Sequence, residues 1–176
     1  MELKNSKTYK NLEAAFAGES QARNKYVFSA SQAKKDGYNQ IGAVFAELAA
    51  QEQEHAKIWF KLLNSDIGST KGNLKAAIAG ESHESQVMYP QFAKEARDEG
   101  FEGIAKLFEL VGGIEKVHTE HYKKCLERLD TDSLFSSTEE ATWICDNCGY
   151  SVSATRAPEC CPVCSHPQAY FRLALQ

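Results

Sequence analysis

The chain has 176 residues, of which 43% are hydrophobic and 25% are charged, and its formal net charge at pH 7 is −4. This composition is typical of a globular protein with one core, with or without a small appendage. No basic cluster indicates binding to nucleic acid, and no apolar run reaches the roughly 20 residues that a membrane span needs. The first ten residues are polar and contain no apolar signal segment, so we expect a cytoplasmic protein.

Within residues 1–130, apolar residues recur at helical spacing in four long segments and predict four helices. The predicted helices cover about residues 6–35, 38–63, 72–98 and 101–129. Gly37 and Gly100 each follow an acidic residue at the end of a segment, and glycine accepts the left-handed conformation that ends many helices. Residues 64–71 break the periodicity and indicate a connection between two helix pairs.

The C-terminal part differs in composition from the helices. We expect a helical domain at residues 1–130, a linker rich in Ser, Thr, Asp and Glu at residues 131–142, and a small domain at residues 143–176. Two Cys-x-x-Cys motifs predict a tetrathiolate metal site, and their spacing is compatible with zinc as well as iron. We expect Cys125 to be a buried thiol and Cys160 to pack without binding metal. The predicted metal ligands are Cys145, Cys148, Cys161 and Cys164.

The two helix pairs repeat one another. Ala-Ala-Phe-Ala-Gly-Glu-Ser at residues 14–20 matches Ala-Ala-Ile-Ala-Gly-Glu-Ser at residues 76–82, at an offset of 62 that becomes 63 after one inserted residue. Few carboxylates inside the predicted helices have a carboxylate at the equivalent position of the other half, because most of the equivalent residues are apolar or basic. Those that recur are Glu19 as Glu81, and Glu52-x-x-His55 as Glu115-x-x-His118.

The recurring residues form the donor set of a metal site. A spacing of three places Glu52 and His55 on the same face of a helix, as it does for their counterparts. One Glu from each of two helices and one Glu-x-x-His from each of the other two is the ligand arrangement of di-iron carboxylate bundles. Buried carboxylates without a cation would repel one another and take up protons. The alternative is that these side chains are ordinary exposed charges on amphipathic helices.

Other residues near this set are less symmetric. Glu84 follows Glu81 by three residues, whereas its counterpart is Ala22, so Glu84 is either an additional carboxylate ligand or a solvated side chain. Tyr26 and Tyr89 recur in both halves. Each either packs in the core or donates a hydrogen bond to a ligand carboxylate.

With these motifs, the chain resembles the rubrerythrin family over almost its whole length. The resemblance implies an all-α, ferritin-like four-helix bundle made of two repeated helix pairs, followed by a small rubredoxin-like tetrathiolate domain. Its motifs, besides the tail, are Ala-Gly-Glu-Ser-Gln-Ala-Arg (17–23), Gln-Glu-Gln-Glu-His-Ala-Lys (51–57), Ala-Gly-Glu-Ser-His-Glu (79–84), Met-Tyr-Pro (88–90) and Glu-Lys-Val-His (115–118).

The resemblance implies a non-haem di-iron peroxidase that reduces hydrogen peroxide to water in oxidative-stress defence. Its implied cofactors are two non-haem irons and one rubredoxin-type iron, which zinc can replace in some preparations. His55 is implied to bind only the reduced site, in exchange with Glu84, and Tyr26 and Tyr89 are implied to lie around the ligands. The remaining implied ligands of the di-iron site are Glu19, Glu52, Glu81, Glu115 and His118.

The resemblance also implies an electron donor, such as a rubredoxin or an NAD(P)H-dependent reductase. It implies homodimers or larger homo-oligomers in which the tail iron of one subunit lies near the di-iron site of another. Two other functions remain compatible with the residues: a ferroxidase or iron-handling protein, and a zinc-ribbon interaction module on a structural bundle. The dedicated electron-entry tail disfavours the first, and the repeated ligand set disfavours the second.

The connection between the helix pairs is short for a ferritin-like bundle, in which the second and third helices run parallel. About 17 Å of helix follows Glu52 and about 14 Å precedes Glu81, whereas the eight residues 64–71 span at most about 28 Å. No length of this connection remains for bending around the bundle. We therefore expect helix pairs exchanged between two subunits, with early fraying of a helix as the alternative.

Overall fold

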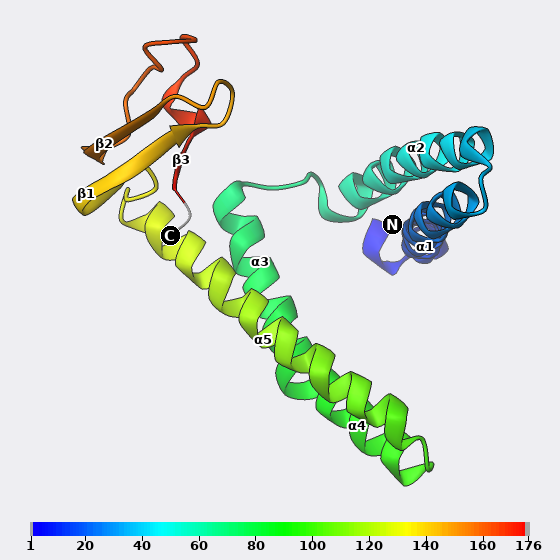
Figure 1. Cartoon of the computed structure of the whole chain (residues 1–176). Coiled ribbons are helices and arrows are strands. Elements are labelled where there is room, and N and C mark those ends of the chain that lie inside the picture. Colours follow the sequence, from blue (N-terminus) through cyan, green and yellow to red (C-terminus); the bar gives the residue numbers. More distant parts are fainter. Residues whose placement is uncertain (1, 175–176) are drawn as a thin grey trace. The chain divides into compact units, whose positions relative to one another are not determined.

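The structure of the protein is a computed structural model that describes residues 2–174 (Figure 1). The chain divides into two compact units between Gly68 and Ser69. The first unit contains one antiparallel helix pair, and the second contains the other pair together with the cysteine-rich tail. None of the helices in residues 2–174 combines the length and apolar composition that crossing a membrane requires.

In the first unit, a short 3₁₀ turn (Leu3–Asn5) leads into α1 (Lys7–Lys35), and α2 (Asn39–Asn64) follows after a tight turn. Ser6 caps α1 by accepting a hydrogen bond from the Tyr9 backbone N–H at 3.1 Å. Gly37 ends α1 with φ 86°, and the Tyr38 N–H bonds to the Ala33 carbonyl at 2.8 Å. These bounds confirm the two predicted helices to within a residue or two at each end.

In the second unit, the predicted third helix is present but has a change of pitch in its middle. It consists of α3 (Thr70–His83), a π-helical turn (Glu84–Met88) and α4 (Tyr89–Asp98), and α5 (Glu102–Asp130) packs against it. A π turn accommodates one residue more than an α turn. The residue inserted in the sequence repeat lies between Ser82 and Tyr89, so the π turn absorbs the insertion.

Both helix pairs are closed by small side chains at equivalent positions, which allow the backbones to approach closely. Every buried position of one pair recurs in the other at the offset of 63. The buried residues of the first pair are Ala30, Ala33, Gly42, Ala49 and Ala56, and those of the second pair are Ala93, Ala96, Ala105, Gly112 and Thr119. The repeat seen in the sequence is therefore a repeat of packing geometry.

Larger apolar side chains of both pairs remain exposed. Each helix pair has a row of such side chains, and a row of large exposed apolar side chains indicates a surface that another element covers. In the first pair these residues are Val27, Phe28, Ile41, Val44, Leu48, Ile58 and Leu62. In the second pair they are Val87, Phe92, Ile104, Leu107, Leu110, Ile114 and Val117.

Two neighbouring glycines in α5 provide a matched test of this close packing. A Cβ on Gly112 would lie 3.0 Å from the Tyr89 Cβ, whereas a Cβ on Gly113 would have no neighbour within 4 Å. We expect Gly113→Ala to stabilise the helix by up to about 1 kcal/mol, and Gly112→Ala to be destabilising by about 1–3 kcal/mol. Denaturant unfolding of the two variants measures the difference. Equal stabilisation by both substitutions would contradict the close contact with Tyr89.

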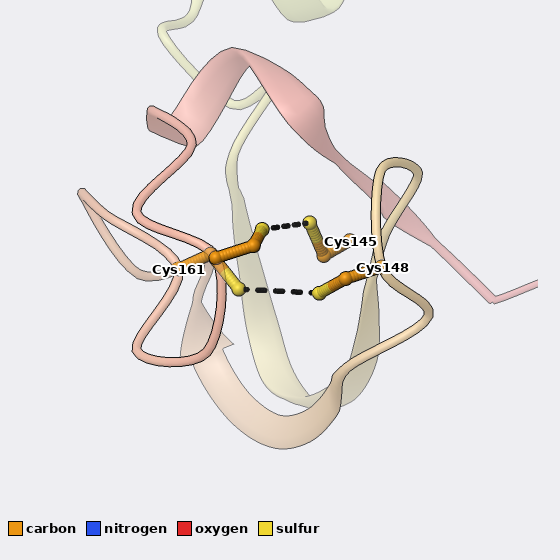
Figure 2. Close-up of side chains that lie close together, drawn as sticks. Cys145, Cys148 and Cys161 are labelled. Carbon is orange, nitrogen blue, oxygen red and sulfur yellow. Dashed lines mark hydrogen bonds between the residues drawn. The ribbon is translucent and has the colours of Figure 1, made fainter.

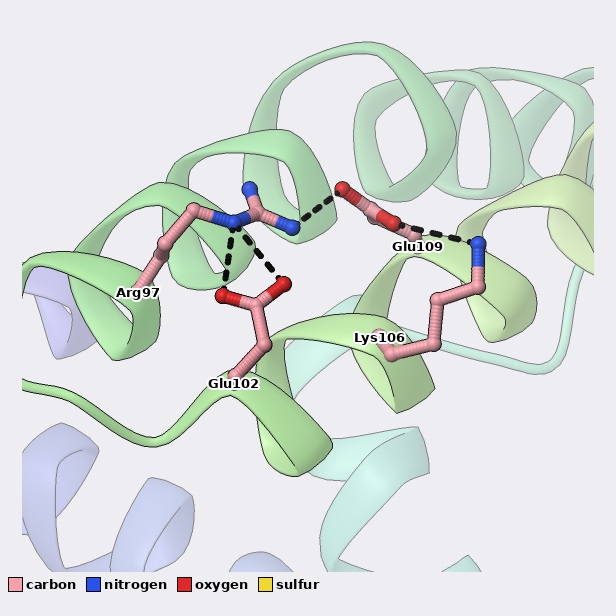
Figure 3. Close-up of polar contacts among 4 residues, drawn as sticks. All are labelled: Arg97, Glu102, Lys106 and Glu109. Carbon is pink, nitrogen blue, oxygen red and sulfur yellow. Dashed lines mark hydrogen bonds and ion pairs between the residues drawn. The ribbon is translucent and has the colours of Figure 1, made fainter.

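Near the turn between α4 and α5, four charged side chains form an ion-pair network (Figure 3). Arg97 donates from Nε to Glu102 at 3.1 Å and from its terminal nitrogen to Glu109 at 2.8 Å, and Lys106 lies 3.5 Å from Glu109. The hydrogen bond from Arg97 lowers the pKa of the Glu109 carboxyl group. The network links α4 to α5, but exposed ion pairs contribute little to stability.

The tail forms a three-stranded antiparallel sheet in the order β2-β1-β3, made of β1 (Ser136–Cys145), β2 (Ser151–Arg156) and β3 (Phe171–Leu173). Its core contains Trp143, which is fully buried and donates from Nε1 to the Ala154 carbonyl at 3.0 Å. β1 begins inside the stretch that we expected to be a linker, because Ser136 pairs with Arg156 and the neighbouring Phe135 packs against the core. The division of the chain into domains otherwise stays a prediction.

Candidate metal centres

The first unit brings Glu19 of α1 together with Glu52 and His55 of α2. The three side chains offer ligand atoms that lie within 4.8 Å of one another, and His55 Nδ1 lies 2.9 Å from a Glu52 carboxylate oxygen. The hydrogen bond to Glu52, together with burial, raises the pKa of Glu19, and hydrogen bonds from His55 and Glu19 lower the pKa of Glu52. The two carboxyl groups thus perturb each other's pKa in opposite directions, as expected for carboxylates held close together.

The second unit repeats this arrangement with Glu81 of α3 and with Glu115 and His118 of α5. His118 Nδ1 lies 2.6 Å from a Glu115 oxygen and 3.5 Å from a Glu81 oxygen. Burial and then the hydrogen bond to Glu115 raise the pKa of Glu81. The repeat-related triads thus have the same electrostatic conflict, which a bound cation would relieve.

Each triad offers two carboxylates and one imidazole, and these donors suit iron in a site with open coordination positions. The residues that the sequence comparison selected are therefore brought together, three in each unit. Two carboxylates held within 4.8 Å of each other are costly for a metal-free protein and favourable for a metal-binding one. The residues present fit a di-iron carboxylate site.

Glu84 is the first residue of the π turn and lies outside the second triad of converging ligand atoms. It nevertheless faces the same region, because burial and then the charges of Glu115, Glu84 and Glu81 raise the pKa of the Tyr89 hydroxyl. Tyr89 also packs against Phe108, with ring centroids 6.0 Å apart. Its neutral phenol lies near these carboxylates, where it is able to donate a hydrogen bond.

Tyr26, the repeat counterpart of Tyr89, packs its ring against Phe45 at a centroid distance of 6.0 Å. Trp59 of α2 is not among the residues that the sequence predicts around the site. Its indole lowers the pKa of Glu19, against the larger effect of Glu52 that raises it. Its position in the sequence could have revealed this proximity, because Trp59 follows His55 by four residues and shares its helix face.

The four predicted cysteine ligands converge in the tail (Figure 2). Cys145 and Cys164 have sulfur atoms 3.7 Å apart, and Cys148 and Cys161 have sulfur atoms 3.6 Å apart. Each motif closes a tight turn that bonds back to its first cysteine, from the Gly149 N–H to the Cys145 carbonyl at 2.8 Å and from the Ser165 N–H to the Cys161 carbonyl at 2.9 Å. The sequence prediction of a tetrathiolate cluster is confirmed as an arrangement of sulfur atoms.

The electrostatics of these sulfurs also favour a cation. The backbone N–H of His166 lowers the pKa of Cys164 to about 6. The Tyr150 backbone N–H favours the Cys148 thiolate, but hydrogen bonding with Cys164 and burial outweigh it and raise the pKa of Cys148 to about 12. A metal ion would resolve this conflict by holding all four sulfurs as thiolates.

The two remaining cysteines lie outside the cluster. Cys160 is exposed and does not join the four sulfurs, in agreement with a non-ligating role. Cys125 is also exposed, so the expectation of a buried thiol was wrong. It lies on the side of α5 away from Ala105, Gly112 and Thr119, whose small side chains face the packed side of the helix.

The fold and the sites define a metalloprotein that joins repeated carboxylate–histidine helix pairs to a small tetrathiolate domain. A family model described as rubrerythrin matches residues 10–126 and 72–142, and a model of the rubrerythrin rubredoxin-like domain matches residues 143–172. The chain belongs to the rubrerythrin family. Its fold is accordingly ferritin-like and mostly helical, with a rubredoxin-like C-terminal domain.

Relatives match over nearly the full length. The chain is 48% identical to rubrerythrin of Porphyromonas gingivalis, over 96% of this chain and 90% of that protein. It is 45% identical to rubrerythrin of Nitratidesulfovibrio vulgaris, over 97% and 96% of the two chains. Its cofactor class is thus a di-iron centre with carboxylate and histidine ligands and a rubredoxin-like centre with four cysteine ligands, and its function class is oxidoreductase.

Proposed function

We propose that the protein is a peroxidase that reduces hydrogen peroxide to water, with electrons delivered through the tetrathiolate iron. The observation that carries this proposal is the presence, on one chain, of two matched Glu-Glu-His triads and one tetrathiolate cluster. The triads provide ligands for a two-metal site, and the tetrathiolate provides a one-electron carrier. An iron-storage protein has no need for such a dedicated electron entry.

The ligands in this proposal are Glu19, Glu52, Glu81, Glu84, Glu115 and His118, with His55 replacing Glu84 when the site is reduced. The different surroundings of the two histidines support these different roles. His118 Nδ1 lies between two carboxylates, Glu115 and Glu81, whereas His55 Nδ1 is hydrogen-bonded only to Glu52. His118 is therefore the more firmly held imidazole, and His55 is the one with freedom to exchange.

Bound ferrous ions supply the two electrons that cleavage of the O–O bond requires. Reduction of hydrogen peroxide to two waters also consumes two protons, and the chain offers groups that hold protons beside the site. The Tyr89 phenol is such a group, because it is not a metal ligand, and burial and its carboxylate neighbours raise its pKa further above the usual value. Tyr26 occupies the equivalent position in the first unit. These residues would orient peroxide and supply protons by hydrogen bonding.

The tail would restore the electrons in two one-electron steps, with a rubredoxin or an NAD(P)H-dependent reductase as the external donor. Four thiolate ligands suit a rubredoxin-type iron. A chain that depends on these free thiolates suits a reducing compartment, so we place the protein in the cytoplasm.

We further propose that the protein is a homodimer in which the helix pairs are exchanged. In a ferritin-like bundle, α2 and α3 run parallel, so the connection must run along the bundle from the end of α2 back to the level where α3 starts. From Glu52 to the end of α2 at Asn64 is about 18 Å, and from the start of α3 at Thr70 to Glu81 is about 16 Å. The five residues 65–69 between the helices span at most about 18 Å.

The connection is thus too short for the two triads of one chain to serve one bundle with intact helices. Pairing α1 and α2 of one chain with α3, α4 and α5 of another removes this conflict. It also covers the apolar rows that each helix pair leaves exposed. A crystal structure in which Glu19 and Glu81 of one chain hold the same metal pair would contradict the exchange.

The peroxidase proposal is tested by metal analysis and by oxidation chemistry. We expect about three irons per chain and visible ferric–thiolate absorption, which reductant bleaches and hydrogen peroxide restores. Iron uptake driven by dioxygen, with no response to peroxide, would favour a ferroxidase instead. A colourless zinc protein, prepared with iron available, would favour a structural zinc-ribbon module.

A further inference from the structure

Trp59 carries an unsatisfied polar atom next to the first triad. Its Nε1 is buried and has no hydrogen-bond acceptor within residues 2–174, although buried polar groups are normally paired. Trp59 lies on α2 four residues after His55 and seven after Glu52, so all three share one helix face. Helical side chains lean toward the N-terminus of their helix, which directs the indole toward these two residues.

The packing of the helix pair places the indole opposite Glu19. Phe60, the next residue on α2, packs against Phe16 of α1 with ring centroids 5.7 Å apart. Phe16 lies one turn before Glu19 on the same helix, so Trp59 and Glu19 occupy adjoining levels of the pair. The effect of the indole on the Glu19 pKa agrees with this proximity.

We propose that Trp59 is a positioning residue, whose Nε1–H donates a hydrogen bond to the Glu19 carboxylate and fixes the orientation in which Glu19 binds metal. The inference rests on the proposed ligand role of Glu19. An indole N–H donates only, so it favours the ionised carboxylate, which is also the metal-binding form. Hydrogen bonds of this kind to ligands orient them and strengthen metal binding.

The repeat shows that the two halves of the site orient their lone glutamates differently. The counterpart of Trp59 is Tyr122, which is 37% exposed and lines a groove with Thr70 and Leu74. Glu81 has His118 Nδ1 at 3.5 Å instead. In the first triad His55 contacts Glu52 but makes no hydrogen bond to Glu19, which leaves the indole as the available donor.

The test compares Trp59→Phe, which keeps an aromatic ring but removes the donor, with Tyr122→Phe as the matched control at the repeat position. Anaerobic calorimetric titration with Fe²⁺ should show about 10- to 100-fold weaker binding at the carboxylate site of Trp59→Phe. Tyr122→Phe should bind Fe²⁺ like the unchanged protein. Equal affinity of all three proteins would overturn the inference. Absence of carboxylate-site binding in the unchanged protein would instead contradict the proposed function.

Two further measurements separate a hydrogen bond from mere packing. Trp59→Phe also removes buried ring surface, so a small fall in the unfolding temperature of the metal-free protein is expected, and a positioning role requires a larger fall in the metal-loaded protein. The chain has two tryptophans. In protein whose tetrathiolate site already holds metal, the Trp59 indole N–H resonance should move downfield when Zn²⁺ fills the carboxylate sites, while that of Trp143, already bonded to Ala154, stays in place. A stationary Trp59 resonance, or equal losses of stability with and without metal, would refute the positioning role.

Discussion

Co-expression of a Glu52→Gln chain with a Glu115→Gln chain is expected to restore peroxide reduction that neither variant has alone. Each substitution removes one carboxylate ligand, and we expect each alone to lower turnover at least about 100-fold. In an exchanged dimer of the two variants, one bundle receives both substitutions and the other receives neither. With equal amounts of both chains, about a quarter of the sites are intact, because half of the dimers are mixed and each has one intact site of two.

Turnover and iron content of the co-purified mixture measure this restoration. The matched controls are Glu54→Gln and Glu120→Gln, since these carboxylates are exposed, pair with Lys57 and Lys123 and lie outside the triads. Each control alone should keep full iron content. If the mixture stays inactive while both variants remain dimeric, the helix pairs of one chain share a bundle and the exchange is wrong.

Cys161→Ser is expected to disconnect the protein from its electron donor and to leave the helix pairs folded. Cys161 is 1% exposed and belongs both to the sulfur cluster and to the core of the tail. Its loss should therefore remove the tetrathiolate iron and loosen the tail. Turnover with a rubredoxin-coupled donor should fall to the background rate, whereas a chemically reduced sample should still be oxidised once by hydrogen peroxide.

Cys160→Ser is the control for this substitution, because Cys160 is adjacent in sequence, exposed and outside the cluster. It should keep the ferric–thiolate absorption and the donor-coupled rate. Unchanged donor-coupled turnover of Cys161→Ser would show that electrons reach the site by another route.

The two halves of the proposed di-iron site have the same ligand types but different surroundings. The second half has the π turn that carries Glu84 and a histidine held by two carboxylates. The first half has a histidine held by one carboxylate and an indole N–H that has no partner among residues 2–174. In the proposed site, such asymmetry would offer one metal position alternative ligands and keep the other fixed.

The sequence by itself determined the helices, the repeat and the grouping of the ligands. These features are local or periodic: Glu and His three residues apart must share a helix face, and Cys-x-x-Cys must form a tight turn. The recurrence of Glu19 as Glu81 identified the candidate ligands on the first and third predicted helices without any knowledge of contacts. The ligand roles themselves, and the exchange of helix pairs, stay predictions.

Only the tertiary structure decided how the inserted residue is accommodated, where β1 begins and what surrounds Glu19. An insertion in a helix can bulge, kink or shift the register, and the packing of α3 and α4 on α5 selected the π turn. The polar composition of residues 136–142 concealed a strand, because pairing with β2 outweighs local preference there. The Trp59 indole N–H, which has no partner in the part of the chain that the structure describes, was equally hidden, since burial of a single N–H depends on side chains from another helix.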